Sequence, residues 1–92
     1  MFRAMVAEEN EYLVVYPGHN TAALLYQRLL NNLCKVELVK APVKISYGCS
    51  HAIKFREIYL DIVISEIKKI KIKPKGIYQI VKKGKLEDYQ KV

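Results

Sequence analysis

The order of its apolar patterns is the feature that most constrains how this chain can fold. Short strand-like runs are interrupted twice by segments with helical spacing. The β-branched and aromatic run Tyr12–Tyr16 stops at Pro17, which predicts a buried strand. The apolar residues of Ala22–Leu33 fall on one helical face, and Asn20 or Thr21 offers an N-cap, so we expect a helix here.

Four further segments complete the pattern. We expect a second strand over Lys35–Val39 and a third strand over His51–Arg56. We then expect a second helix over 58–70 and a last strand over Ile77–Val81. The segment 58–70 fits both helical spacing and strand alternation, and its length and its Lys68-Lys69 ending favour the helix. The polar residues 82–92 are expected to form a frayed tail.

This β-α-β-β-α-β order predicts an α+β fold of the ferredoxin-like split type, with an antiparallel sheet and two helices on one face. The four strands of such a sheet lie in the order 4-1-3-2. Three connections, far apart in the sequence, then open on one edge of the sheet: Pro17–Asn20, Gly48–His51 and Lys71–Lys75. We therefore expect these three segments to be spatial neighbours.

Ninety-two residues are the length of one domain. We expect a single domain over 1–92, with an ordered core at about 11–82 and flexible ends at 1–10 and 83–92. A chain this short buries only about 60–65% of its unfolded surface, so it has no room for a deep active-site cavity beside its core. A functional site is expected on an edge, on a sheet face or at a dimer interface.

Charge is unevenly spread along the chain. Residues 66–92 carry nine Lys against three acids, a net of +6, and residues 1–65 carry seven Lys or Arg against six acids, a net of +1, which together give +7. A basic C-terminal part suits nucleic acid or an anionic partner, but it is more often a set of solvated lysine faces, the interpretation we favour.

The expected compartment is the cytoplasm, with no membrane partner. Two cysteines do not make the disulfide framework of a secreted mini-protein. The first residues lack the apolar stretch of a signal peptide, and no uncharged apolar run approaches the roughly 20 residues of a membrane span.

Cys49 is the candidate for bond-making chemistry. The sequence has no Ser/His/Asp set at a known spacing, no P-loop, no Gly-rich dinucleotide turn and no paired carboxylates, so we do not expect an enzyme. Cys49 follows Gly48 in a short polar stretch between two apolar runs, where a turn can present a thiol. A small buried hydrophobe is the alternative role for Cys49, and it is the role expected for Cys34, which lies next to leucines at a helix–strand junction.

The sequence around this turn resembles the Se/S carrier protein-like family, a group of small bacterial domains. The resemblance runs from about Tyr12 to Val81. The segments that carry it are Val14–Pro17, Ala22, Ala41–Val43, Ile45–Cys49, Ala52–Phe55 and Gly76–Tyr78. The cysteine turn is its specific part. Ser50 is a departure, because the family usually has glycine directly after the cysteine, and glycine has more freedom for positive φ.

The resemblance implies a sulfur or selenium carrier without a cofactor, in which Cys49 accepts the chalcogen as a persulfide or selenosulfide. Donor and acceptor proteins would be its partners. The predicted fold surrounds the thiol with a helix N-terminus and with cations, which favour a thiolate. The residues expected there are His19, Asn20, Gly48, Ser50, His51, Lys71, Lys73 and Lys75.

The two histidines and the three lysines of this set have alternative roles. His19 either supports the thiol or helps to cap the first helix. Cys49, His51 and His19 could supply three metal ligands, but C-x-H is a poor zinc spacing, and we expect no metal site. The lysines could equally dock an acidic partner.

Two other classes of function stay open. A nucleic-acid-binding module would stack bases on Tyr12, Tyr16 and Phe55 of the central strands, although the segment His51–Phe55 lacks the Gly-and-aromatic pattern of RNA-binding sheets. This alternative requires that these rings point away from the helices. An interaction module would bury an exposed sheet face against a second copy of the chain, giving a homodimer.

Overall fold

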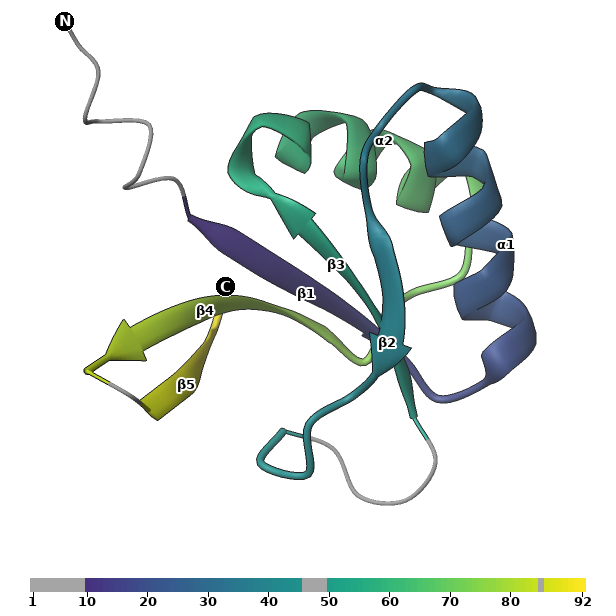
Figure 1. The fold of residues 1–92 in the computed structure, drawn as a ribbon. Helices are drawn as coiled ribbons and strands as arrows, with labels where there is room; N and C mark the ends of the chain where they lie inside the picture. Colours follow the sequence, from purple (N-terminus) through teal and green to yellow (C-terminus); the bar gives the residue numbers. More distant parts are fainter. Residues whose placement is uncertain (1–9, 46–49, 85) are drawn as a thin grey trace, which may run out of the picture.

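The computed structural model describes residues 10–45, 50–84 and 86–92 of the chain. Its elements follow in the order β1 (Glu11–Tyr16), α1 (His19–Asn31), β2 (Glu37–Lys40), β3 (His51–Arg56), the 3-10 helix η2 (Glu57–Tyr59), α2 (Leu60–Ile70), β4 (Gly76–Lys83) and β5 (Leu86–Lys91). Both helices lie on one side of the sheet, and the β4–β5 hairpin extends away from them (Figure 1). The chain is therefore an α+β protein, as the pattern predicts.

Five antiparallel strands form one sheet in the order β2-β3-β1-β4-β5. Strands β1 to β4 have the neighbours expected from the order 4-1-3-2, which is the same order counted from the opposite edge of the sheet. Strand β5 lies outside β4 and is an addition to the expected four strands. The prediction of a frayed tail over 82–92 is wrong, because β4 continues to Lys83 and β5 pairs with it along its whole length. Gly84, at the hairpin turn, has a φ of 63°, which glycine adopts without a steric cost.

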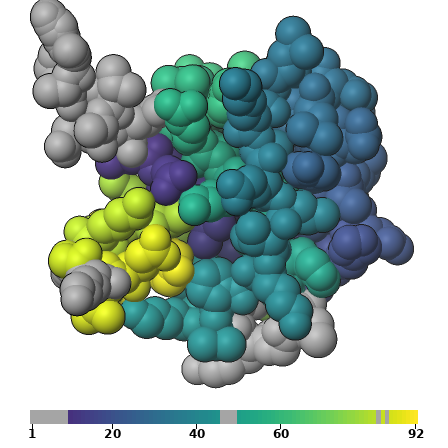
Figure 2. Space-filling view, viewed as in Figure 1, coloured from purple at the N-terminus to yellow at the C-terminus, as the bar shows by residue number. Residues whose placement is uncertain are grey.

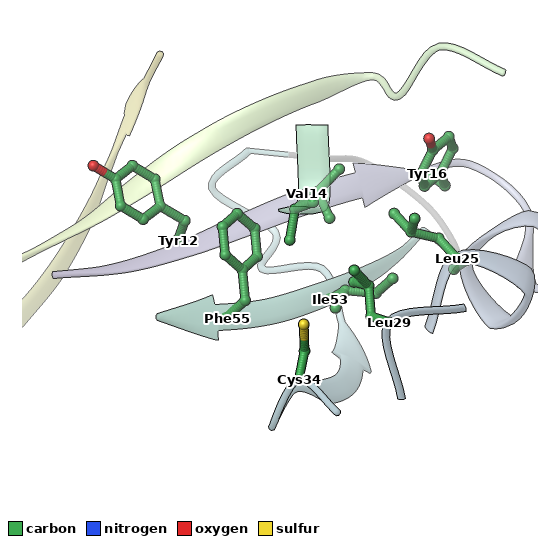
Figure 3. Packing of buried hydrophobic residues seen from close by; sticks show 10 residues of the cluster. Tyr12, Val14, Tyr16, Leu25, Leu29, Cys34, Ile53 and Phe55 are labelled. Carbon is green, nitrogen blue, oxygen red and sulfur yellow. The ribbon is translucent and has the colours of Figure 1, made fainter. Parts of the chain in front are cut away.

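The larger core lies between the sheet and the two helices. Apolar side chains from β1 and β3 pack there against α1 and α2, and Figure 3 shows part of this cluster. Its buried members are Tyr12, Val14, Tyr16, Ala22, Leu25, Leu29, Cys34, Ile53, Phe55 and Val63. The rings of Tyr12 and Phe55 stack with their centroids 5.7 Å apart. Because these aromatic side chains fill the core on the helix side, they offer no platform for stacking nucleic-acid bases.

A second apolar layer covers the opposite face of the sheet. Its buried residues are Leu13, Val15, Ala52 and Ile80, and the partly buried Ala41, Ile45, Tyr78 and Tyr89 pack against them. The segment after β2 reaches the β5 strand, where Lys44 Nζ donates a hydrogen bond to the carbonyl of Glu87 at 3.0 Å. Figure 2 shows these teal and yellow segments side by side. The centre of this face is therefore buried within the chain and is not the open surface that a face-to-face dimer requires.

A buried carboxylate joins the two helices. Glu66 of α2 is 4% exposed and accepts a hydrogen bond from Arg28 Nε of α1 at 2.6 Å. Lys69 and Asn32 donate to its other oxygen. The Arg28 hydrogen bond is the main reason why the pKa of Glu66 lies below its usual value. This network fixes α2 against α1 on the helix side of the sheet.

Candidate functional site

Three connections meet at the end of the sheet where β1 ends and β3 and β4 begin. The amide of Lys75, just before β4, donates to the carbonyl of Val15 at 2.7 Å. Lys75 Nζ donates to Ser50 Oγ at 3.2 Å. The rings of His19 and His51 lie edge to face with centroids 4.9 Å apart and planes inclined by 69°. The prediction that these segments are spatial neighbours is therefore confirmed for these described residues.

Ser50 is the buried polar residue of this cluster. It is 4% exposed, and its carbonyl accepts a hydrogen bond from the amide of Ala41 at 3.0 Å. Its hydroxyl accepts from the Lys75 ammonium group, which is charged and therefore makes a stronger hydrogen bond than a neutral donor. These two contacts hold the start of β3 to the chain that leaves β2 and to the chain that enters β4.

The two histidines differ in burial. His51 is the first residue of β3, where it pairs with Tyr16 of β1 and Lys40 of β2, and it is partly buried. Its Nδ1 atom is buried and has no hydrogen-bond partner within residues 10–45, 50–84 and 86–92. His19 is exposed in the first turn of α1. Because an imidazole nitrogen either donates or accepts, His51 Nδ1 can still form one hydrogen bond with a group at this site.

The start of α1 differs from the expected one. Gly18 is the N-cap and makes no side-chain cap, so the prediction of Asn20 or Thr21 as N-cap is wrong. Asn20 instead lies exposed in the first turn, beside His19 in sequence. The first-turn amides of a helix lack intrahelical partners and carry a partial positive charge. This end of α1 therefore adds positive potential to the cluster.

The other predicted site residues lie in different places. Gly48 and Cys49 are outside the described residues, and Cys49 directly precedes Ser50 in the sequence. Lys75 belongs to the cluster, whereas Lys71 and Lys73 border a groove beside α2. The hydrogen bond between Ser50 and Lys75 is not predictable from the sequence pattern. Because 25 residues separate the two, no local pattern could have revealed it.

Cys34 is buried in the helix-side core, as predicted. It is 2% exposed, and its thiol contacts the carbonyl of Asn32 at 3.9 Å. Burial, and after it the charge of Glu66, raises the pKa of the Cys34 thiol. A neutral buried thiol is a poor nucleophile, so Cys34 has a structural role.

Among residues 10–45, 50–84 and 86–92, no three His, Cys, Asp or Glu side chains are grouped so that they could hold a metal ion. Neither α1 nor α2 combines the length and the apolar character that crossing a bilayer would require.

Comparison with known families identifies the class of protein. A model of the family described as "Putative Se/S carrier protein-like" matches residues 11–79. The chain therefore belongs to the Se/S carrier protein-like family, and the description points to a role in carrying selenium or sulfur. Neither the curated proteins nor the solved structures contain a match to the chain.

Proposed function

We propose that this protein carries sulfur or selenium on Cys49 and passes it between a donor protein and an acceptor protein. Membership of the family over residues 11–79 is the observation that carries the proposal. The cluster of Ser50, His51, His19 and Lys75 supports it, because Cys49 directly precedes Ser50 in the chain. The protein acts as a carrier and has no turnover of its own.

The chemistry of loading is a thiolate exchange. The Cys49 thiolate attacks the outer chalcogen atom of a donor persulfide or selenopersulfide. A bond forms between Cys49 Sγ and that atom, the bond from the atom to the donor sulfur breaks, and the donor leaves as a thiolate. The sulfane sulfur or selenium keeps its oxidation level, so no external oxidant or reductant takes part. Unloading is the same exchange with an acceptor thiolate as the attacking group.

The described side chains have three roles in this proposal. Lys75 and the N-terminus of α1 supply positive potential that favours a thiolate over a thiol. The hydroxyl of Ser50 holds Lys75 in place, a contact that glycine, the usual family residue at this position, cannot make. His51 Nδ1, which is buried without a hydrogen-bond partner among the described residues, can bind the loaded chalcogen.

Intact-mass spectrometry after treatment with a small persulfide, such as glutathione persulfide, tests the proposal. The wild type should gain the mass of one sulfur atom, and a reductant should remove it. The Cys49→Ser variant should gain nothing. Cys34→Ala is the matched control, because it removes the buried thiol and should load as the wild type does. An adduct that persists in Cys49→Ser would overturn the proposal.

The same assay separates the role of Lys75 from a general effect of charge. Lys75→Met should slow loading by up to about fivefold, because an exposed ion pair contributes about 1 kcal/mol or less. Lys35→Met removes an exposed lysine at the start of the chain leading to β2 and should leave the loading rate unchanged. Equal loading rates in both variants would show that Lys75 does not contribute to the reactivity of Cys49.

A further inference from the structure

A groove with an apolar floor lies between the end of α2, the segment 71–75 and the start of β4. Its volume is about 420 Å³. The residues that line it are Ile64, Ile67, Lys68, Lys71, Ile72, Lys73, Pro74 and Ile77. Ile64 and Ile72 are 36% and 42% exposed, so their side chains remain in contact with solvent. Large apolar side chains gathered in one hollow are typical of a surface that another molecule covers.

The rim of the groove is positively charged. Lys68, Lys71 and Lys73 are exposed, and the lining contains no acidic residue. None of these three lysines has an ion-pair or hydrogen-bond partner within the described chain. Glu66, two residues before Lys68 on α2, is bound to Arg28 on the side facing α1 and does not neutralise them.

The groove and the cluster around Ser50 share one segment of the chain. Residues 71–74 form part of the groove, and the next residue, Lys75, donates to Ser50. The buried hydroxyl of Tyr16 donates to the carbonyl of Ile72 at 2.8 Å and fixes this segment to the end of β1. A molecule seated in the groove therefore contacts the segment that leads directly to Lys75, and Lys75 in turn contacts Ser50, the residue that follows Cys49 in the sequence.

We propose that this groove docks an acidic segment of the protein that exchanges sulfur or selenium with the chain, with one or two apolar side chains inserted between α2 and β4. The partner's carboxylates pair with Lys68, Lys71 and Lys73, while its apolar side chains cover the isoleucines. The inference rests on the proposed function for the identity of the partner. A single-stranded nucleic acid fits less well, because such ligands stack on aromatic rings and the lining has none.

Peptide binding to the full-length protein tests the inference. The probe is a fluorescein-labelled peptide Asp-Glu-Leu-Phe-Glu-Asp, and its affinity is measured by fluorescence anisotropy at moderate salt. One control peptide replaces Leu-Phe with Ser-Ser, and a second replaces the acids with Lys. We expect the first peptide to bind at least about tenfold more tightly than either control. In the spectrum of the isotope-labelled protein, the amide signals that shift should be those of residues 64–77.

Protein variants separate the groove from general electrostatic attraction. Ile72→Ser and Lys68→Glu should each weaken binding of the peptide by about tenfold. Their matched controls are Ile58→Ser, at an isoleucine that is 63% exposed outside the groove, and Lys35→Glu, both of which should bind within about twofold of the wild type. The Cys49→Ser variant should bind as the wild type does, because docking requires no thiol.

Several results would overturn the inference. These are no binding, equal binding of the Ser-Ser peptide, equal weakening by Lys35→Glu, or an oligothymidine that displaces the peptide and binds more tightly. Failure of docking is distinguishable from failure of the carrier function. If Cys49 loads sulfur but the peptide does not bind, the docking surface is wrong and the carrier stands. If the peptide binds but Cys49 does not load, the groove stands and its partner is not a chalcogen donor or acceptor.

Discussion

Replacing Glu66 with glutamine tests how the two helices are held together. The Glu66 carboxylate is buried, and Arg28 Nε donates to Oε1 at 2.6 Å. Asn32 Nδ2 and Lys69 Nζ each donate to Oε2 at 3.3 Å. The Glu66→Gln variant keeps the shape of the side chain and one acceptor oxygen, but it loses the charge.

The expected loss follows from these contacts. A hydrogen bond to a charged group contributes about 1.5–3 kcal/mol, and a pair with an exposed lysine contributes about 1 kcal/mol or less. The cost of burying the carboxylate opposes both, and the Arg28 side chain, 40% exposed, stays hydrated when its partner is removed. We therefore expect the free energy of unfolding to fall by about 1–2 kcal/mol near neutral pH, which lowers Tm by roughly 5–15 °C.

The effect should depend on pH in a defined direction. The Arg28 hydrogen bond lowers the pKa of Glu66 from its ordinary value of 4.5. When a carboxyl group has a lower pKa in the folded state than in the unfolded state, it stabilises the fold fully at pH values above its pKa in the unfolded state. This stabilisation is lost as the pH falls through the pKa of the group in the folded state. The difference between wild type and Glu66→Gln should therefore be full above pH 4.5 and vanish in stronger acid.

Urea unfolding followed by far-ultraviolet circular dichroism, repeated from neutral to acid pH, measures this difference. Lys69→Gln is the control, because the Lys69 side chain is 59% exposed and its loss should cost less than about 0.5 kcal/mol. A Glu66→Gln difference that is below about 0.5 kcal/mol at neutral pH, or that is the same at every pH, would refute the reasoning.

Three further predictions concern other parts of the fold. Tyr16→Phe removes the buried hydroxyl that donates a hydrogen bond to the carbonyl of Ile72, so the free energy of unfolding measured in urea should fall by about 1–2 kcal/mol. An unchanged free energy of unfolding would contradict this. Burial, and secondarily the Glu66 charge, raises the pKa of Cys34, so iodoacetamide should label this thiol far more slowly in the folded protein than in urea; equal rates would show that it is accessible. Deleting residues 84–92 removes β5 and uncovers Ile80, so the free energy of unfolding derived from a thermal melt should fall by about 2 kcal/mol or more. An unchanged Tm would mean that β5 does not contribute to the stability of the fold.

The central part of the fold could be predicted because its sequence pattern is strong. Tyr12–Tyr16 is apolar at every position, since both faces of β1 are buried, and it forms a strand as expected. The third strand was predicted over His51–Arg56, the range that β3 occupies. The order of the elements then placed His19 near His51, a long-range contact that follows from topology alone.

The fifth strand could not be predicted from its own residues. Tyr89 is the one partly buried residue of β5, and the other five are exposed, so the strand has no apolar alternation. Backbone pairing with β4 and the packing of Tyr89 against Ile80 hold it in place. Gly84 was the available signal, because a glycine between two polar runs can form a hairpin turn.

The candidate site could be predicted only in part. Topology brings the three connections together, but it does not specify which side chains make contact. The hydrogen bond from Lys75 to Ser50 depends on side-chain geometry, and the groove beside α2 depends on how Ile72 and Ile77 pack beside the helix. Lys71 and Lys73, predicted beside Lys75 at the thiol, line this groove, and their position relative to Cys49 stays a prediction because Cys49 lies outside the described residues.

Transfer of a labelled sulfur atom tests the carrier function most directly. The protein is loaded with isotopically labelled sulfane sulfur, separated from the donor and mixed with an acceptor thiol, and mass spectrometry follows the label. The account predicts that the label leaves the wild-type protein and appears as the persulfide of the acceptor, in an amount equal to the loaded Cys49, while Cys49→Ser neither acquires nor passes it. A label that stays on the protein, or one that Cys49→Ser transfers as well as the wild type does, would contradict the account.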